Sequence, residues 1–288
     1  MSLIIIILLL FLGAFIGFIA GLLGIGGGFI MVPVLIYLYT YLGIPLNISV
    51  KTAVGTSLFV IFLTSISGVY RHNMFKNIIW KCSFTLGLCG IIGSIVGVKL
   101  VVEYLNGNIY KILFGLFLML ISLNIIYNNI KYRNKKDDSN NVKSKIREKN
   151  YYVDNICHTI DYKKVGLIGF LTGFISSVFG VGGGIVIVPF LNIFLKFPIR
   201  YAIGTSIGMM MIISLSGLIG YLISSSPFNP TLYNIGYVSI LTGLIMAPIA
   251  MISSKYGVII GEKTKSEHLK WILSIILMII GIKMVLLN

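Results

Sequence analysis

The sequence has few acidic residues, with 8 Asp and Glu against 23 Lys and Arg among 288 residues. None of the eight stands in the middle of a long apolar segment. Glu103 is at the end of one, and the others fall in polar stretches. Proton relays and Na⁺ sites in membranes are commonly built from buried carboxylates, and metal cations need similar oxygen ligands. The sequence therefore shows no sign of these chemistries and leaves a neutral or anionic substrate.

Cysteine and histidine are also rare, with 3 residues of each. The cysteines have no C-x-x-C or Cys/His ligand spacing, so we expect no metal site, no disulfide and no cofactor. We expect His72, His158 and His268 to be solvated, because they lie in or beside basic loops. No intramembrane cluster of His, Asp or Glu is available for acid–base catalysis, which argues against an enzyme.

What the chain has in excess is apolar sequence. Hydrophobic residues make up 57% of it, charged residues 11%, and the mean hydropathy is +0.98. A soluble domain lacks this balance, whereas a membrane helix needs about 20 apolar residues. The first apolar run lacks the basic n-region and cleavage site of a signal peptide, so we expect a retained helix. The net charge of +15 is concentrated in a few loops, which favours membrane topology over nucleic-acid binding.

Two copies of one sequence unit follow each other along the chain. The stretch "GIGGGFIMVP" begins at Gly24 and "GVGGGIVIVP" begins at Gly180, an offset of 156. Downstream, "AVGTS" at Ala53 matches "AIGTS" at Ala202 at an offset of 149. Two later pairs match again at 156: Gly87 with Gly243, and Lys99 with Lys255. An internal repeat of this kind predicts two equivalent structural units.

Each copy contains about four to five apolar segments, which predicts an all-α polytopic membrane protein. In the first repeat, residues 1–130, the segments are 3–23, 29–42, 51–70, 82–101 and 110–130. In the second repeat, residues 165–288, they are 165–180, 185–197, 201–223, 233–254 and 269–287. Residues 131–164 are polar and charged, and we interpret them as a basic cytoplasmic linker.

The distribution of Lys and Arg sets the orientation. With the linker in the cytoplasm, loops 71–81, 196–200 and 255–270 are also inside, and 19 of the 23 basic residues fall on that side. The uncharged loop 224–232 then lies outside, as do both termini. An odd number of membrane-entering segments per copy inverts the second copy relative to the first. Such inverted-topology repeats are typical of secondary transporters, whose substrate site lies near the bilayer midplane.

The glycine runs predict a helix break in each copy. Segments 29–42 and 185–197 are about 20 Å long at 1.5 Å per residue, shorter than a hydrocarbon core of about 30 Å. We therefore expect residues 24–28 and 180–184 to be non-helical, as broken or re-entrant helices near the midplane. Pro33 and Pro189 fit the first turns of the helices that follow. Unpaired N–H groups at such helix starts form a ready anion site.

Candidate substrate contacts come from the two motifs of each copy. They are Gly26, Gly27, Gly28, Thr56, Ser57, Gly182, Gly183, Gly184, Thr205 and Ser206. Packing alone is an alternative role for the glycines, and Ser or Thr hydroxyls in membrane helices also bond their own backbone carbonyls. The spacing of Gly13, Gly17 and Gly21 favours close helix packing over binding.

The repeated motifs resemble the TauE/SafE sulfite exporter family of bacterial membrane proteins. The likeness rests on the two glycine motifs, each followed by a GTS motif, and covers roughly 5–130 and 165–287. It implies a permease of the bacterial plasma (inner) membrane for small sulfur-containing anions such as sulfite, sulfonates or sulfoacetate. It also implies that the glycine and GTS positions contact the substrate. The linker is not part of the family motif.

The predicted function is a secondary transporter for a small anion, held near the midplane between the paired glycine breaks. No Arg or Lys stands in mid-membrane, so backbone dipoles and hydroxyls would hold the anion rather than a salt bridge. The expected partners are the anion and the lipid bilayer, without nucleic acid, and a homo-oligomer is left open. The alternative is a passive anion channel on the same architecture, without saturation or coupling to an ion gradient.

Overall fold

The computed structural model describes residues 3–23, 26–133, 162–193, 197–227, 233–263 and 267–286. The first half contains α1 (Leu3–Leu23), α2 (Gly28–Tyr41), α3 (Leu46–Met74), α4 (Trp80–Lys99), the π-helical segment η1 (Leu100–Tyr104) and α5 (Gly107–Arg133). The second half contains α7 (Tyr162–Phe179), α8 (Gly184–Ile193), α9 (Ile199–Ile223), α10 (Ile240–Lys263) and α11 (Glu267–Leu286).

The helices follow the predicted apolar segments, which confirms the all-helical class. In the described ranges, six helices are long and apolar enough to cross a membrane: α1, α3, α4, α5, α9 and α10. The predicted segment 233–254 starts too early. The short strands β1 (Asn234–Ile235) and β2 (Val238–Ser239) pair antiparallel there, and α10 begins only at Ile240. Most of the predicted linker, 134–161, lies outside the described residues.

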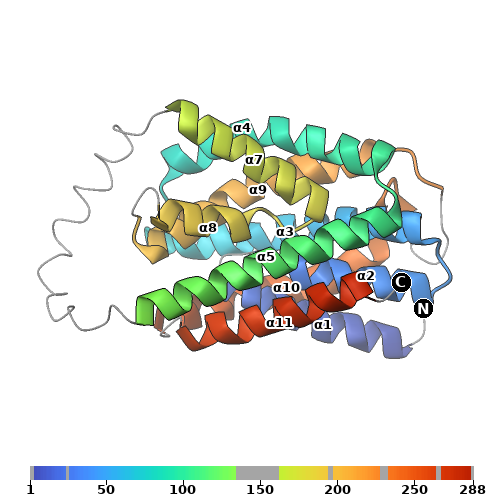
Figure 1. The fold of residues 1–288 in the computed structure, drawn as a ribbon, viewed down its shortest axis with the longest axis horizontal. Coiled ribbons are helices and arrows are strands. Elements are labelled where there is room, and N and C mark those ends of the chain that lie inside the picture. The colour runs from blue at the N-terminus through green and yellow to red at the C-terminus, as the bar shows by residue number, and fades with distance from the viewer. Residues whose placement is uncertain are drawn as a thin grey trace, which may run out of the picture.

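The two halves interlock. α1 packs along α10 of the other half and α7 packs along α4, while α3 crosses α9 and α5 lies against α11. Figure 1 shows both termini at one end of the molecule, and α5 finishing and α7 beginning at the opposite end. The chain enters α3 from the end that carries the termini and enters α9 from the opposite end. The pairing of α1 with α10 thus has a counterpart in the pairing of α7 with α4.

Glycine lets the paired helices touch along their backbones. A Cβ at Gly13 would lie 2.8 Å from the carbonyl oxygen of Met246, and one at Gly17 would collide with the backbone of Ala250. In a bilayer, lipid tails are as apolar as leucine, so close backbone packing is what joins such helices. The packing role predicted for Gly13 and Gly17 is therefore confirmed.

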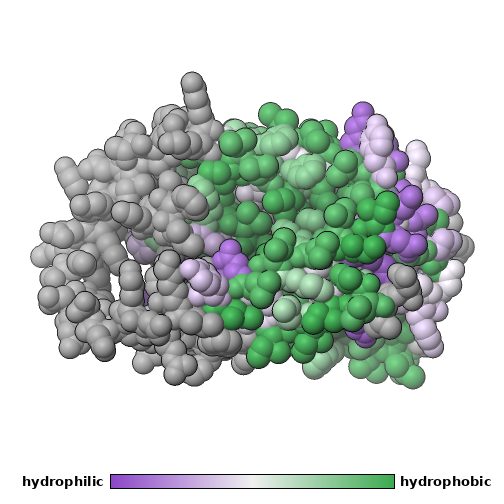
Figure 2. Space-filling model, viewed as in Figure 1, coloured by the Kyte–Doolittle hydropathy of each residue, from purple (hydrophilic) through white to green (hydrophobic). Residues whose placement is uncertain are grey.

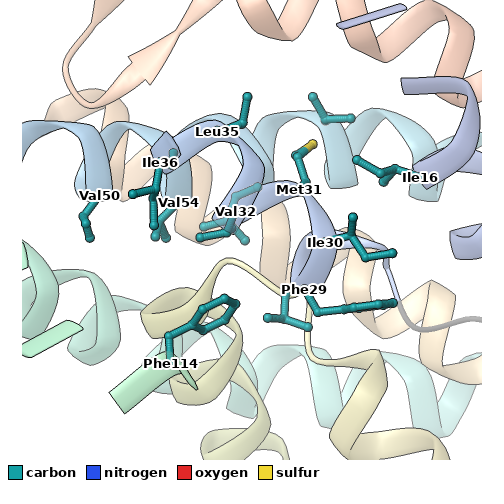
Figure 3. Packing of buried hydrophobic residues seen from close by; sticks show 14 of the residues in the cluster. Ile16, Phe29, Ile30, Met31, Val32, Leu35, Ile36, Val50, Val54 and Phe114 are labelled. Carbon is teal, nitrogen blue, oxygen red and sulfur yellow. The ribbon is translucent and has the colours of Figure 1, made fainter. Parts of the chain in front are cut away.

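Large apolar side chains surround α2 on the inside of the bundle. Phe29 and Val32 belong to one buried cluster with Val50 and Val54 of α3 and Phe114 of α5 (Figure 3). The outside is apolar too. Figure 2 shows a band of hydrophobic residues across the middle of the visible face, with hydrophilic residues gathered at one end. Such a band suits a protein surrounded by hydrocarbon.

Candidate functional site

Each glycine run forms a turn directly before a helix. Gly26 and Gly27 have φ angles of 89° and 69°, and Gly182 and Gly183 have φ angles of 77° and 78°. A side chain with a Cβ rarely adopts this left-handed conformation, so the backbone requires glycine at these four positions. α1 ends before the first turn and α2 begins after it, and α7 and α8 flank the second turn in the same way. The chain is therefore non-helical at Gly26, Gly27 and 180–183, as predicted, and residues 24 and 25 lie outside the described ranges. The prediction is wrong for Gly28 and Gly184, which begin α2 and α8, because the first residue of a helix needs no acceptor for its own N–H.

The two turns, one from each half, lie against each other. A Cβ at Gly28 would collide with the carbonyl oxygen of Gly180. A Cβ at Gly26 would lie 2.7 Å from the carbonyl oxygen of Val181. The glycines of one half therefore allow its turn to approach the backbone of the other half.

Two apolar side chains from the crossing helices α3 and α9 cover the paired turns. The Cε of Met210 would lie 3.1 Å from a Cβ at Gly26 and 3.7 Å from one at Gly182. Ile61 approaches Gly182 and Gly28, with methyl carbons 2.9 Å from the corresponding Cβ positions. Ile61 and Met210 occupy matching places in the two repeats, at the offset of 149. Sequence reasoning missed both, because an apolar residue in an apolar helix carries no signal.

Both helix starts present unpaired backbone N–H groups. The carbonyl of Gly27 accepts the N–H groups of the next turn of α2, and the carbonyl of Gly183 does the same for α8. Within the described ranges, no acceptor is found for the N–H groups of Gly27, Gly28, Gly183 and Gly184. These groups carry the positive end of the helix dipole, so each turn has the donors that an anion needs.

The GTS motif of α3 contacts the segment that leads into α10. Gly55 leaves room for the carbonyl oxygen of Tyr237, with which a Cβ would collide. The next residue, Thr56, accepts the N–H of Ser239 at 2.9 Å and the hydroxyl of Tyr39 at 3.5 Å. The threonine hydroxyl thus caps the start of α10, a use of the motif that its sequence alone does not reveal.

The GTS motif of α9 contacts the segment that leads into α4 in the same manner. A Cβ at Gly204 would lie 2.5 Å from the carbonyl oxygen of Asn77, and Thr205 accepts the N–H of Ile79 at 3.1 Å. Asn77 and Ile79 correspond to the residues that meet the first motif at an offset of 160. The sequence match at an offset of 156, which paired Gly87 of α4 with Gly243 of α10, is therefore wrong by four residues, about one helical turn. A shift of one turn keeps apolar residues on the same face of a helix.

The serines of the two motifs are both buried donors. Ser57 donates to the carbonyl oxygen of Gly180 at 2.6 Å and so links α3 to the second glycine turn. Ser206 donates to the carbonyl oxygen of Ile203 at 2.7 Å, one turn back on its own helix. The bond of Ser57 thus reaches the glycine turn of the other half.

The comparisons with known proteins agree with this architecture. Residues 9–284 match the family described as sulfite exporter TauE/SafE. A probable membrane transporter protein of Methanocaldococcus jannaschii is 40% identical over 280 residues, covering 97% of this chain and 95% of that protein. Similar proteins of Haemophilus influenzae, 30% identical over 98% of both chains, and Bacillus subtilis (YunE), 28% identical over 97% of both, carry the same description. No solved structure matches the chain.

The chain belongs to the sulfite exporter TauE/SafE family. It is a multi-pass membrane protein of a transporter family and not an enzyme. In the described part of this TauE/SafE protein, no group of three or more His, Cys, Asp or Glu residues is placed to hold a metal ion.

Two polar residues are buried in this TauE/SafE protein, His72 and Ser176. The sequence analysis predicted the wrong environment for the first and did not single out the second. His72 is 3% exposed, so its predicted solvation is wrong, and neither ring nitrogen has a hydrogen-bond partner within the described ranges. The basic residues around it suggested a loop, but α3 continues through it to Met74. Ser176 is fully buried, its hydroxyl has no partner in the part of the chain that the structure describes, and its Cβ would lie 3.5 Å from a Cβ at Gly183. It adds an unused polar group beside the second turn.

Replacing Thr56 with valine should destabilise the protein. The buried N–H of Ser239 would lose its acceptor, at a cost of about 1–3 kcal/mol. Thr64→Val on the same helix is the control, because the described bond of Thr64 is to the carbonyl oxygen of Ile61 on its own helix, at 3.0 Å. Thermal unfolding in detergent should show a lower midpoint for Thr56→Val than for Thr64→Val. Equal midpoints would refute the capping role.

Proposed function

We propose that this protein is a secondary transporter of the plasma membrane for a small, sulfur-containing anion such as sulfite or an organosulfonate. The anion binds between the two glycine turns, near the middle of the bilayer. The observation that carries this proposal is the apposition of the turns, since a Cβ at Gly28 would collide with the carbonyl of Gly180. Two helix starts with unpaired N–H groups converge there, and such groups favour an anion.

The transport mechanism rests on an inverted arrangement of the two halves. The chain enters α3 and α9 from opposite ends of the molecule (Figure 1). Together with the 19 of 23 basic residues expected on one side, this supports inversion of the second repeat and external termini. Each turn is then reached from its own side of the membrane. Rocking of one half against the other would expose the shared site alternately, as inverted repeats allow.

The proposed site suits a substrate that must also leave. Helix-end interactions contribute roughly 0.3–1 kcal/mol each, or about 2 when partly buried. Hydrogen bonds to a charged ligand add about 1.5–3 kcal/mol each. After ordering and desolvation costs, this supports binding in the micromolar to millimolar range. The site carries no permanent buried charge, which would be costly when the site is empty. Ser176, buried and unpaired beside the second turn, supplies a further donor.

Uptake by the purified protein in liposomes tests the proposal. Sulfite, small sulfonates, sulfate and carboxylates would be compared at a range of concentrations, with and without an imposed ion gradient. Saturable uptake of sulfite or a sulfonate that responds to a gradient is the expected result. Flux that rises linearly with concentration and ignores the gradient would instead indicate a passive channel. Absence of uptake for every anion would overturn the proposal.

A further inference from the structure

Lys51 lies near the beginning of the central helix α3, outside the two motifs. α3 has 29 residues and is therefore about 44 Å long, which exceeds a hydrocarbon core of about 30 Å. Lys51 is half-buried near the end at which α3 begins, about 9 Å along the helix axis from Ser57. The chain enters α3 from the end of the molecule that carries the termini (Figure 1), so Lys51 precedes Thr56 and Ser57 along the helix on that side.

Segments of both halves surround the Lys51 ammonium. Its Nζ donates to the carbonyl oxygen of Val102 at 2.7 Å, in the π-helical segment η1. The same Nζ lies 5.6 Å from the ring centroid of Tyr237, in the segment that leads to α10. Burial raises the pKa of the Tyr237 phenol, so this ring stays neutral and faces the lysine as a π surface. π-Helical turns are frequent at functional sites.

No carboxylate pairs with Lys51 in the described part of the chain. Glu103 follows Val102, but its side chain is exposed and makes no ion pair with the lysine there. A carbonyl and a ring face stabilise an ammonium group without cancelling its charge. The positive potential at this end of α3 is therefore available to an anion.

The residue after Lys51 adds a second, independent observation. Thr52 is fully buried, and its hydroxyl has no hydrogen-bond partner among the described residues. An unpaired buried hydroxyl is normally costly, since it has lost its water without a replacement. Thr52 lies one turn before Thr56, so both belong to the same face of α3. An unused donor thus stands between the lysine and the polar residues next to the turns.

We propose that Lys51 and Thr52 form a recruiting site for small oxyanions at the beginning of α3. The ammonium group attracts the anion, and the Thr52 hydroxyl donates to it before it moves on to the glycine turns. This inference rests on the proposed function, because it gives the transported anion an entry site.

Charge and hydroxyl variants test the recruiting site through the half-saturation concentration for sulfite uptake in liposomes. Lys51→Gln should raise it about tenfold and weaken its dependence on ionic strength, while Lys51→Arg should stay within about threefold of wild type. Lys283→Gln is the matched control, since the exposed Lys283 Nζ also lies over a tyrosine ring, 5.1 Å from the centroid of Tyr37. It should leave the half-saturation concentration unchanged.

Thr52→Val separates binding from structure. It should not lower the thermal unfolding midpoint, because it removes an unpaired hydroxyl, yet it should raise the half-saturation concentration about threefold or more. Equal sulfite affinity in wild type, Lys51→Gln and Thr52→Val would overturn the recruiting site and leave the proposed transport intact. If the wild type takes up no anion, transport itself fails. The recruiting site is then judged by thermal stabilisation with sulfite, which Lys51→Gln must lose and the wild type must show.

Discussion

Gly28→Val is expected to abolish anion uptake while the protein still reaches the membrane. The reason is local: a Cβ at Gly28 would collide with the carbonyl oxygen of Gly180 and lie 2.9 Å from the hydroxyl of Ser57. The variant therefore forces apart the two turns that hold the proposed site. We expect the same of Gly184→Val, because Gly184 begins α8 as Gly28 begins α2.

Gly166→Val on α7 is the control for this result. The nearest atom to a Cβ at Gly166 is the Sγ of Cys89 at 3.5 Å, an ordinary contact. Uptake into liposomes and monodisperse elution in detergent would be measured for all variants. Transport by correctly folded Gly28→Val at the wild-type rate would mean that close apposition of the turns is not needed.

Ser57→Ala is expected to reduce uptake about tenfold or more. Its hydroxyl makes the 2.6 Å bond to Gly180 that ties α3 to the second turn. Removing it leaves a buried carbonyl unpaired, at a cost of about 1–3 kcal/mol, and loosens the turn. The fold-change follows from that energy, since about 1.4 kcal/mol corresponds to a factor of ten.

Ser65→Ala provides the matched control on the same helix. Ser65 donates at 2.7 Å to the carbonyl oxygen of Phe62, one turn back, so its removal disturbs no contact between the halves. Its uptake should stay within about twofold of wild type, given that local back-bonds of this kind contribute little. Similar losses in both variants would show that the bond to Gly180 has no special role.

The helix breaks could be predicted from sequence because glycine has a direct conformational effect. Consecutive glycines mark a turn, and Gly26, Gly27, Gly182 and Gly183 all have positive φ angles. The expectation for the prolines was wrong, because Pro33 and Pro189 lie inside α2 and α8, beyond the first helical turn. The existence of the helices followed from apolar length, but some boundaries did not, since α3 continues to Met74 and α10 begins only at Ile240. The repeat itself was visible because both motifs occur twice in one order.

The partners of the GTS motifs could not be predicted in this way. Thr56 meets Ser239 across 183 positions, and Thr205 meets Ile79 across 126. A single sequence contains no signal for pairing between segments so far apart. The alignment of α4 with α10 as equivalent helices of the two repeats was missed for a related reason. A shift by one helical turn leaves the apolar residues on the same face, so the sequence match looks equally good. The same limit hid the burial of His72, which depends on its neighbours in space.

The inversion of the two halves is tested most directly by cysteine labelling in intact cells. In a background without Cys82, Cys89 and Cys157, single cysteines would replace Ser226, in the loop before α10, and Ser144, in the linker. A membrane-impermeant maleimide should label the cysteine at 226 in intact cells, and the one at 144 only after permeabilisation. Labelling of both from the same side would contradict the inverted repeat, and with it a site shared by two opposed glycine turns.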